Sequence, residues 1–235
     1  MRLIDSGICS PRESVLRDTV LLDARAAAEA PDTLHLYRRD RPTVSLGRFS
    51  RPEDCLRMEA LEKMGAEVVR RPSGGSCIYT DSGQMIYSLT VSADRLPPKR
   101  EDIFPLICGG LVEALRLLGI EAVHKPINDV LVDGEKISGS AQARRRGVLI
   151  QQGTLIVDLD LEAMDSILIP LKERSYRGMT SLREQGVDIS WEELAETLRR
   201  GFSQALGREI REGVWTPQEE SRLARLRTES SSSSR

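Results

Sequence analysis

A short hairpin-like segment places a lysine close to an Asn–Asp pair. Residues 130–132 are an apolar run, Asp133 and Gly134 follow, and an alternating pattern resumes at Lys136. An Asp-Gly pair between two such runs predicts a β-hairpin with a two-residue turn. The hairpin would hold the Lys136 ammonium at a fixed distance from Asn128 and Asp129. We therefore expect a site that binds a phosphate or a carboxylate.

A glycine-rich segment, residues 70–76, lies upstream between strand-like runs at 67–69 and 77–79. It begins with two arginines and contains Ser73, Gly74 and Gly75. Glycines let backbone N–H groups approach an anion closely. Two loops of this kind, each accompanied by cations, predict one shared pocket for an anionic group.

The net charge of the chain is too small to attract a highly charged partner over a long range. The chain has 235 residues, with 34 basic and 36 acidic side chains and a net charge of −2. This balance gives no field that would attract nucleic acid or an anionic membrane. Neither partner is expected, and recognition must be local.

The remaining composition favours a cytoplasmic protein with reduced thiols. No apolar run approaches the roughly 18 residues of a spanning helix, and the first residues lack the apolar core of a signal peptide. The four cysteines are scattered and form no CxxC pair. This spacing suits isolated thiols better than a zinc site or a disulfide framework. Two histidines are too few for a multi-histidine metal centre.

Helix and strand signals alternate along the chain, which predicts an α/β fold. The predicted helices cover residues 10–29, 52–64 and 102–118 and a segment from 190 onward. The predicted strands cover residues 34–37, 43–46, 67–69, 77–79, 85–91, 130–132, 136–138 and 148–157. We expect one domain over residues 1–215 and a charged, Ser-rich tail over 216–235, with a short helix followed by disorder.

Three motifs in this order resemble lipoate-protein ligases of the A type, within the biotin/lipoate protein ligase superfamily. Residues 70–81 resemble their Arg-Arg-x-Ser-Gly-Gly-Gly-Ala-Val-x-His-Asp segment, and Asn128 to Ala141 resembles their lysine motif. Gly153 and Thr154 begin a segment similar to their His-Gly-Thr-Leu strand. Biotin ligases share the lysine spacing, but their first loop resembles Gly-Arg-Gly-Arg. Lipoate or a medium-chain fatty acid is therefore the better substrate prediction.

The resemblance implies a catalytic domain with a mixed, largely antiparallel β-sheet flanked by α-helices. It also implies an ATP-dependent ligase that activates lipoate or octanoate as acyl-AMP and transfers the acyl group to a lysine of a carrier domain. Lys136 would contact the carboxylate and the α-phosphate in both half-reactions. Two unit charges about 4 Å apart interact by about 1 kcal/mol in water but about 4 kcal/mol at an effective dielectric near 20, so this role needs a water-poor pocket.

The same resemblance assigns the other site residues. Asn128 and Asp129 would hold ATP and its Mg²⁺, with Asp129 as the metal ligand. Arg70 would bind a phosphate or the acyl carboxylate. The expected substrate- and ATP-binding residues are Arg70, Ser73, Gly74, Gly75, Ser76, Cys77, Asn128, Asp129, Gly139, Ser140, Ala141, Gly153 and Thr154.

The chain departs from the family pattern at three positions. Ser76 replaces the third glycine, Thr80 replaces the loop histidine, and Gln152 replaces the histidine before Gly-Thr-Leu. A serine restricts φ more than a glycine does. We therefore expect the substrate affinity or the chain-length preference to differ.

Two alternative functions remain open. An octanoyl- or lipoyltransferase, or an amidotransferase, would act without ATP through a cysteine thioester. Such relatives carry a cysteine just before the Asn128 segment, where this chain has residues Val123 to Pro126. Cys77 has no obvious base beside it, and we interpret it as a small packing residue. The second alternative is a non-catalytic homologue that binds an acylated carrier, and it gives no reason for Lys136 beside Asn128 and Asp129.

The expected partner is a lipoyl carrier protein. The candidates are a glycine-cleavage H protein, a lipoyl domain of a 2-oxoacid dehydrogenase and an H-like protein. Many lipoate ligases append a small C-terminal domain, and only about seventy residues follow Asp160 here. We expect either a separate accessory subunit or an enzyme that works without one.

Overall fold

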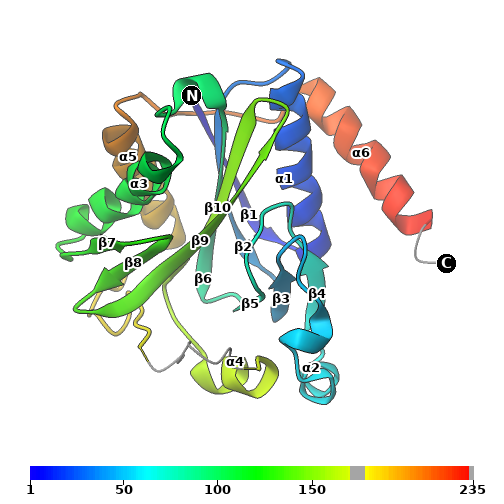
Figure 1. The fold of residues 1–235 in the computed structure, drawn as a ribbon, viewed down its shortest axis with the longest axis vertical. Helices are drawn as coiled ribbons and strands as arrows, with labels where there is room; N and C mark the ends of the chain where they lie inside the picture. The colour runs from blue at the N-terminus through cyan, green and yellow to red at the C-terminus, as the bar shows by residue number, and fades with distance from the viewer. Residues whose placement is uncertain (170–177, 233–235) are drawn as a thin grey trace.

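The fold consists of two β-sheets and the helices that cover them (Figure 1). A computed structural model describes residues 1–169 and 178–232. The strands are β1 (Arg2–Cys9), β2 (Thr33–Arg39), β3 (Thr43–Leu46), β4 (Glu67–Arg70), β5 (Ile78–Thr80), β6 (Gln84–Ser92), β7 (Val123–Lys125), β8 (Asp129–Val132), β9 (Glu135–Arg145), β10 (Val148–Ile156) and β11 (Arg211–Glu212). The helices are α1 (Pro11–Ala26), α2 (Met58–Met64), α3 (Ile103–Leu117), α4 (Leu161–Ile167), α5 (Trp191–Leu206) and α6 (Pro217–Ser232).

The predicted fold class is confirmed. Within the described residues the large sheet has eight strands in the order β11-β1-β2-β6-β10-β9-β8-β7, and the small sheet has the order β4-β3-β5. In the large sheet only β11–β1 and β1–β2 pair in parallel, and the other neighbours are antiparallel. The sheet is thus mixed and largely antiparallel.

Strand alternation divides the large sheet into two different faces. Leu34 and Leu36 of β2 are fully buried on the face covered by α3 and α5, where Tyr87 packs against Phe202 with ring centroids 5.3 Å apart. His35 lies between Leu34 and Leu36 in β2, so its side chain points to the other face of the sheet, as does that of Ser88, which is directly opposite it in β6. One face carries the apolar core, and the other carries polar side chains.

The polar face is covered by α1 and, beside it, by the small sheet (Figure 1). Ser10 begins α1 by accepting a hydrogen bond from the Glu13 N–H at 3.3 Å, and Pro11 occupies its first turn. A side-chain acceptor at the N-cap and a proline in the first turn both favour the start of a helix. Helix α5 begins with a complete capping box, in which the Ser190 side chain accepts from the Glu193 N–H and the Glu193 side chain accepts from the Ser190 N–H.

The segment from 52 to 64 is not one continuous helix, so that prediction is wrong. A 3₁₀ turn covers Pro52–Asp54, and α2 begins only at Met58. Leu56 instead forms a β-bridge with Leu168, and the Arg57 N–H donates to the Ile167 carbonyl at 2.8 Å. Contacts with a distant segment therefore replace one helical turn.

Part of the expected tail forms the helix α6. Its Glu219 side chain is fully buried and pairs with Arg2. Arg227 forms an ion pair with Glu13 in the first turn of α1, and Arg222 forms one with Glu29 in the segment that follows α1. The helix therefore lies along α1 on the outside of the molecule (Figure 1). In the described part of the chain, no helix is both long enough and apolar enough to cross a membrane.

Candidate functional site

The predicted hairpin is confirmed, and it contains a bulge. Asp133 and Gly134 both have positive φ, 49° and 84°, as a type I′ turn requires. Lys136 is opposite Leu131, but Gly139 is opposite Asp129, so one extra residue is inserted in β9 between these two pairs. Without it, residues three apart would face opposite sides of the sheet. The bulge brings Lys136 and Gly139 to the same face.

Lys136 is fixed by an ion pair at this point. Its Nζ lies 2.7 Å from Oδ1 of Asp129, and the two side chains are 26% and 29% exposed. A Cβ on Gly139 would lie 2.6 Å from that Nζ. The glycine therefore leaves the space that the ammonium occupies.

Asn128 is held by the neighbouring strand. Its side-chain amide donates to the Ser140 carbonyl, and the Ser140 N–H donates to the Asn128 carbonyl at 3.0 Å. The Asn128–Asp129 pair is therefore positioned by the same β9 strand that carries Lys136.

These residues line a cavity of about 430 Å³. Its floor is a row of directly opposite residues across five strands, and all of them line the cavity: Tyr37, Ile86, Thr154, Gly139 and Asp129. The volume lies in the range of small-molecule sites. The register of the sheet therefore determines which side chains form the floor.

The glycine-rich loop forms part of the wall. Gly47 donates its N–H to the Ser76 carbonyl at 3.1 Å, and a Cβ on Gly47 would lie only 1.9 Å from the Gly75 carbonyl oxygen. The buried Arg71 donates to the Gly74 and Ser76 carbonyls at 2.6 and 2.8 Å. Burial lowers the pKa of Arg71 to about 10. The loop is thus built around a buried cation.

Eleven of the predicted site residues line the cavity: Gly75, Ser76, Cys77, Asn128, Asp129, Lys136, Gly139, Ser140, Ala141, Gly153 and Thr154. Three do not, and they support the loop instead. Arg70 donates to the carbonyls of residues 47, 48 and 50. Ser73 accepts from Arg71 Nε at 3.1 Å, and the Gly74 N–H donates to the Gln142 carbonyl at 3.3 Å.

Sequence reasoning missed several lining residues. Arg71 faces the cavity where Arg70 was expected to, and Tyr37, Arg39 and Gln152 also line it. The sequence carried a signal for Arg71. Val69 is buried, and a residue two positions farther along a strand points to the same face. Apolar lining residues from the segments 159–168 and 178–179 carried no such signal.

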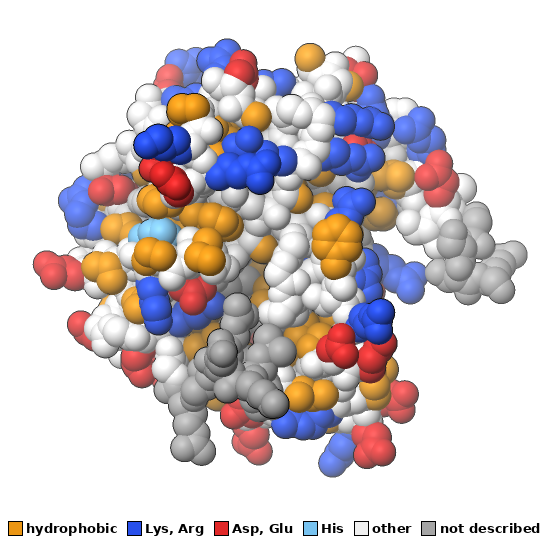
Figure 2. Space-filling view, in the orientation of Figure 1, with side chains coloured by type: hydrophobic (Ala, Val, Ile, Leu, Met, Phe, Trp, Pro, Cys, Tyr) orange, Lys and Arg blue, Asp and Glu red, His pale blue; other side chains and the backbone are white. Residues whose placement is uncertain are grey.

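The cavity is electropositive. Among its described lining residues, Arg39, Arg71, Lys125 and Lys136 are basic, and Asp129 is the one carboxylate. Basic and hydrophobic side chains also lie close together on the face shown in Figure 2. This charge distribution suits an anionic ligand.

The cysteines are poor nucleophiles in this structure. All four are buried. Burial raises the pKa of Cys9 to about 11 and that of Cys77 to about 12, and it also raises the pKa of Cys108. Cys77 is the one that lines the cavity, and its thiol is directed to the Cys55 carbonyl at 3.7 Å.

The described residues contain no cluster of three or more His, Cys, Asp or Glu side chains that could hold a metal ion. Mg²⁺ often takes only one or two carboxylates together with substrate phosphates and water. Asp129 with Asn128 fits that pattern, and its role as a metal ligand stays a prediction.

Solved structures define the class of protein. The bi-partite lipoate protein ligase of Thermoplasma acidophilum, described with its E2 lipoyl domain, is similar with a TM-score of 0.84 and 27% identity, over 96% of this chain and 91% of that one. A lipoate-protein ligase A bound with ATP gives the same TM-score and identity and covers 93% of that chain. The fold is therefore that of the lipoate-ligase class.

The sequence assigns the family. The profile of the lipoyl protein ligase A/B catalytic domain matches residues 10–203, and the chain belongs to that family. Its curated relatives include the octanoyltransferase LipM of Kyrpidia tusciae, 34% identical over 93% of this chain and 91% of the relative. The LipM of Geobacillus kaustophilus is 31% identical over 97% and 95%. The family resemblance is confirmed, and the relatives include both ligases and transferases.

Proposed function

We propose that this protein is an ATP-dependent lipoate-protein ligase. It activates lipoate or octanoate as an acyl adenylate and then transfers the acyl group to a lysine of a lipoyl carrier domain. The observation that carries the proposal is the Lys136 ammonium, fixed 2.7 Å from Asp129 beside Asn128 at one end of an electropositive cavity. ATP in the similar ligase A structure supports it.

The first half-reaction joins two anions. A carboxylate oxygen of the acid attacks the α-phosphorus of ATP, the new P–O bond forms, and pyrophosphate leaves. Lys136 reduces the repulsion between the carboxylate and the α-phosphate. Asn128 and Asp129 would hold the nucleotide and its Mg²⁺, and the metal ion would supply positive charge that stabilises the phosphates.

The second half-reaction uses the same groups. The neutral amine of the carrier lysine attacks the acyl carbon, the C–O bond to AMP breaks, and the amine loses a proton. Lys136 stabilises the negative charge that develops on the acyl and phosphate oxygens. The mixed anhydride must be shielded from water until the carrier binds.

The E2 lipoyl domain described with the Thermoplasma ligase supports a lipoyl domain as the carrier. Phe49 and Ile127 are 85% and 71% exposed. Phe49 is close in sequence to Gly47, which contacts the glycine-rich loop, and Ile127 precedes Asn128, which lines the cavity. They offer apolar contacts near the cavity, where a carrier must present its lysine.

The octanoyltransferase is the second candidate, because the LipM relatives share up to 34% identity with this chain. A transferase that forms an acyl thioester needs an accessible thiol that ionises near neutral pH. The four cysteines are buried, and burial raises the pKa of three of them. This chemistry therefore favours the ligase over a thioester mechanism.

Pyrophosphate release distinguishes the two functions. We expect purified protein with lipoate and ATP to release pyrophosphate, and to lipoylate an added lipoyl domain only when ATP is present. Transfer from an octanoylated carrier without ATP, with no pyrophosphate release, would establish the transferase. Binding of the acylated carrier without any turnover would establish the non-catalytic homologue.

A separate accessory subunit is supported by the similar Thermoplasma ligase, which is bi-partite. A second experiment tests whether this chain needs one. Single-turnover rates are measured from ATP plus lipoate and from supplied lipoyl-AMP. If the chain needs a partner, the second rate is fast and the first is slow. Two equally fast rates indicate a ligase that works alone.

Cys77→Ser and Cys77→Ala are expected to remain active within about twofold, with no acyl adduct on any cysteine. The physical reason is that burial raises the pKa of Cys77 to about 12, so almost no thiolate exists at neutral pH. Intact-mass spectrometry after incubation with octanoyl donors checks for an adduct. An octanoyl adduct on Cys77 would contradict the expectation and favour the transferase.

A further inference from the structure

The cavity has a second polar end, far from Lys136. The floor row runs from Asp129 and Gly139 through Thr154 and Ile86 to Tyr37. Neighbouring strands lie about 4.8 Å apart, so Tyr37 on β2 lies about 14 Å from Gly139 on β9. An acid that has its carboxylate at Lys136 and lies along this floor reaches toward Tyr37 and Arg39.

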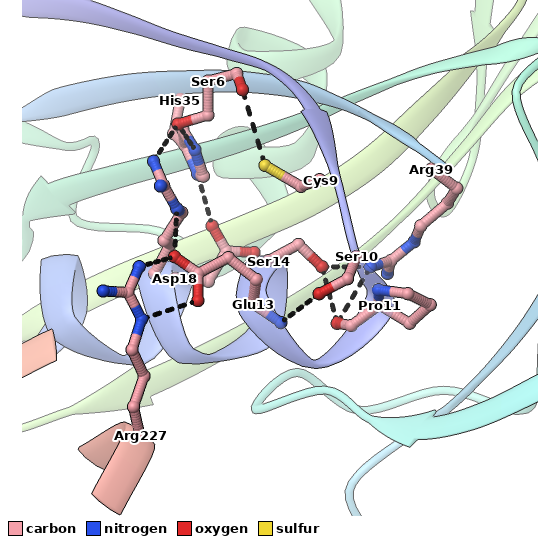
Figure 3. A network of polar contacts seen from close by, with 11 residues as sticks. Ser6, Cys9, Ser10, Pro11, Glu13, Ser14, Asp18, His35, Arg39 and Arg227 are labelled. Carbon is pink, nitrogen blue, oxygen red and sulfur yellow. Dashed lines mark hydrogen bonds and ion pairs between the residues drawn. The ribbon is translucent and has the colours of Figure 1, made fainter. Parts of the chain in front are cut away.

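Arg39 at this end is buried, and not all of its hydrogen-bond donors have a partner. Its side chain lines the cavity, and the residue is 3% exposed. One terminal nitrogen donates to the Pro11 carbonyl at 3.1 Å and contacts the Ser14 hydroxyl (Figure 3). Its Nε is buried and has no hydrogen-bond partner. Among the described residues no carboxylate forms an ion pair with Arg39.

The surroundings of Arg39 do not neutralise it. Its guanidinium lies over the Tyr37 ring, 5.4 Å from the centroid. The nearby buried carboxylate, Asp18, is occupied by His35 at 2.8 Å, by Tyr37 at 3.1 Å and by Gln152 at 2.6 Å. Figure 3 shows Asp18 beside His35 and apart from Arg39. Arg71 adds a second buried cation to the cavity wall.

Gln152 completes the polar end. Its Nε2 donates to Asp18, which fixes the orientation of the amide, because a carboxylate cannot donate to the amide oxygen. The Gln152 Oε1 atom is buried without a partner. A buried cation without a carboxylate partner is energetically unfavourable, so an acceptor group on a ligand is the natural complement for Arg39.

We propose that Arg39 recognises the far end of the acyl substrate, and that the preferred acid carries a hydrogen-bond acceptor there instead of a bare methyl group. The acceptor is either the sulfur of a dithiolane ring or a second carboxylate. This inference rests on the proposed function, because that function places the reacting carboxylate at Lys136. The subsite then selects among medium-chain acids.

Calorimetric titration of the full chain without ATP or carrier tests this subsite alone. The probes are octanoate, lipoate and octanedioate. We expect lipoate, octanedioate or both to bind about tenfold more tightly than octanoate, since a hydrogen bond to a charged group contributes about that factor. A gain for octanedioate alone identifies a carboxylate, and a gain for lipoate alone identifies sulfur.

Arg39→Met is expected to remove this advantage, so that the three acids bind the variant with affinities equal within about twofold. Arg41→Met is the matched control, because Arg41 is 53% exposed and pairs with Asp40 at the surface. Arg39→Lys keeps the charge and should keep part of the selectivity. If Arg39→Met does not fold, the proposal is tested by the order of the affinities for the three acids in the wild type and in Arg39→Lys.

The inference is wrong if octanoate binds as tightly as the other two acids, if no acid binds, or if the advantage survives Arg39→Met. Each of these results leaves the pyrophosphate assay free to report on the ligase. Conversely, selective acid binding without pyrophosphate release would contradict the ligase and keep the subsite.

Discussion

Lys136→Ala is expected to reduce both adenylate formation and transfer from lipoyl-AMP by about 10² to 10³, the usual effect of losing a preorganised electrostatic contact at a developing charge. The fold should stay intact. The side chain is partly exposed, and the strand contacts of residue 136 are made by its backbone, which donates to the Gly178 carbonyl at 2.7 Å and accepts from the Thr180 N–H at 3.0 Å.

Single-turnover rates for the two half-reactions, together with a melting curve, check this prediction. Lys63→Ala is the matched control, because Lys63 is exposed on α2 and does not line the cavity. If the purified Lys136→Ala protein kept a tenth of the wild-type rate with a normal melting curve, Lys136 would not be the essential cation.

The hairpin shows what local sequence can predict. Asp133 and Gly134 define the turn, and the apolar run before them defines β8, because turn type and alternation depend on neighbouring residues alone. The bulge between Lys136 and Gly139 was not predicted. It depends on the pairing of β9 with β8, and only that pairing shows that both residues face the cavity.

The glycine-rich segment, residues 70–76, shows a limit of prediction from local sequence. The family resemblance assigned the phosphate or the acyl carboxylate to Arg70, whereas Arg71 is the arginine of this pair that lines the cavity. Arg70 is exposed and donates to the carbonyls of residues 47, 48 and 50, whereas Arg71 is buried in the loop. The alternation that begins at Val69 gives the correct face, provided that the strand continues to residue 71.

Long-range contacts explain the elements that were missed. The break before α2 follows from the bridge of Leu56 with Leu168, more than a hundred residues away in the chain. The burial of Glu219 follows from its ion pair with Arg2 at the other end of the chain. The polar end of the cavity likewise joins Arg39 and Gln152 from β2 and β10. None of these contacts has a local signature.

Gly139→Ala tests whether the position of the Lys136 ammonium, and not only its presence, matters. The added Cβ would lie 2.6 Å from Nζ and 2.7 Å from Cε of Lys136, and 3.3 Å from Oδ1 of Asp129. The flexible lysine end can move away, so we expect little loss of stability. Displacement of a catalytic group by about 1 Å can cost about 10²-fold in rate, and we expect a loss of that order.

Gly109→Ala is the matched control for this substitution. Gly109 lies inside α3, and the nearest contact of its added Cβ would be Ala205 at 3.6 Å, an ordinary van der Waals distance. This change should raise the melting temperature slightly, because alanine favours a helix by about 1 kcal/mol over glycine, and activity should not change. Rates and melting curves of both variants are compared with the wild type. A Gly139→Ala protein that melts normally and keeps full activity would show that catalysis tolerates a displaced Lys136, and it would remove the geometric argument for its role.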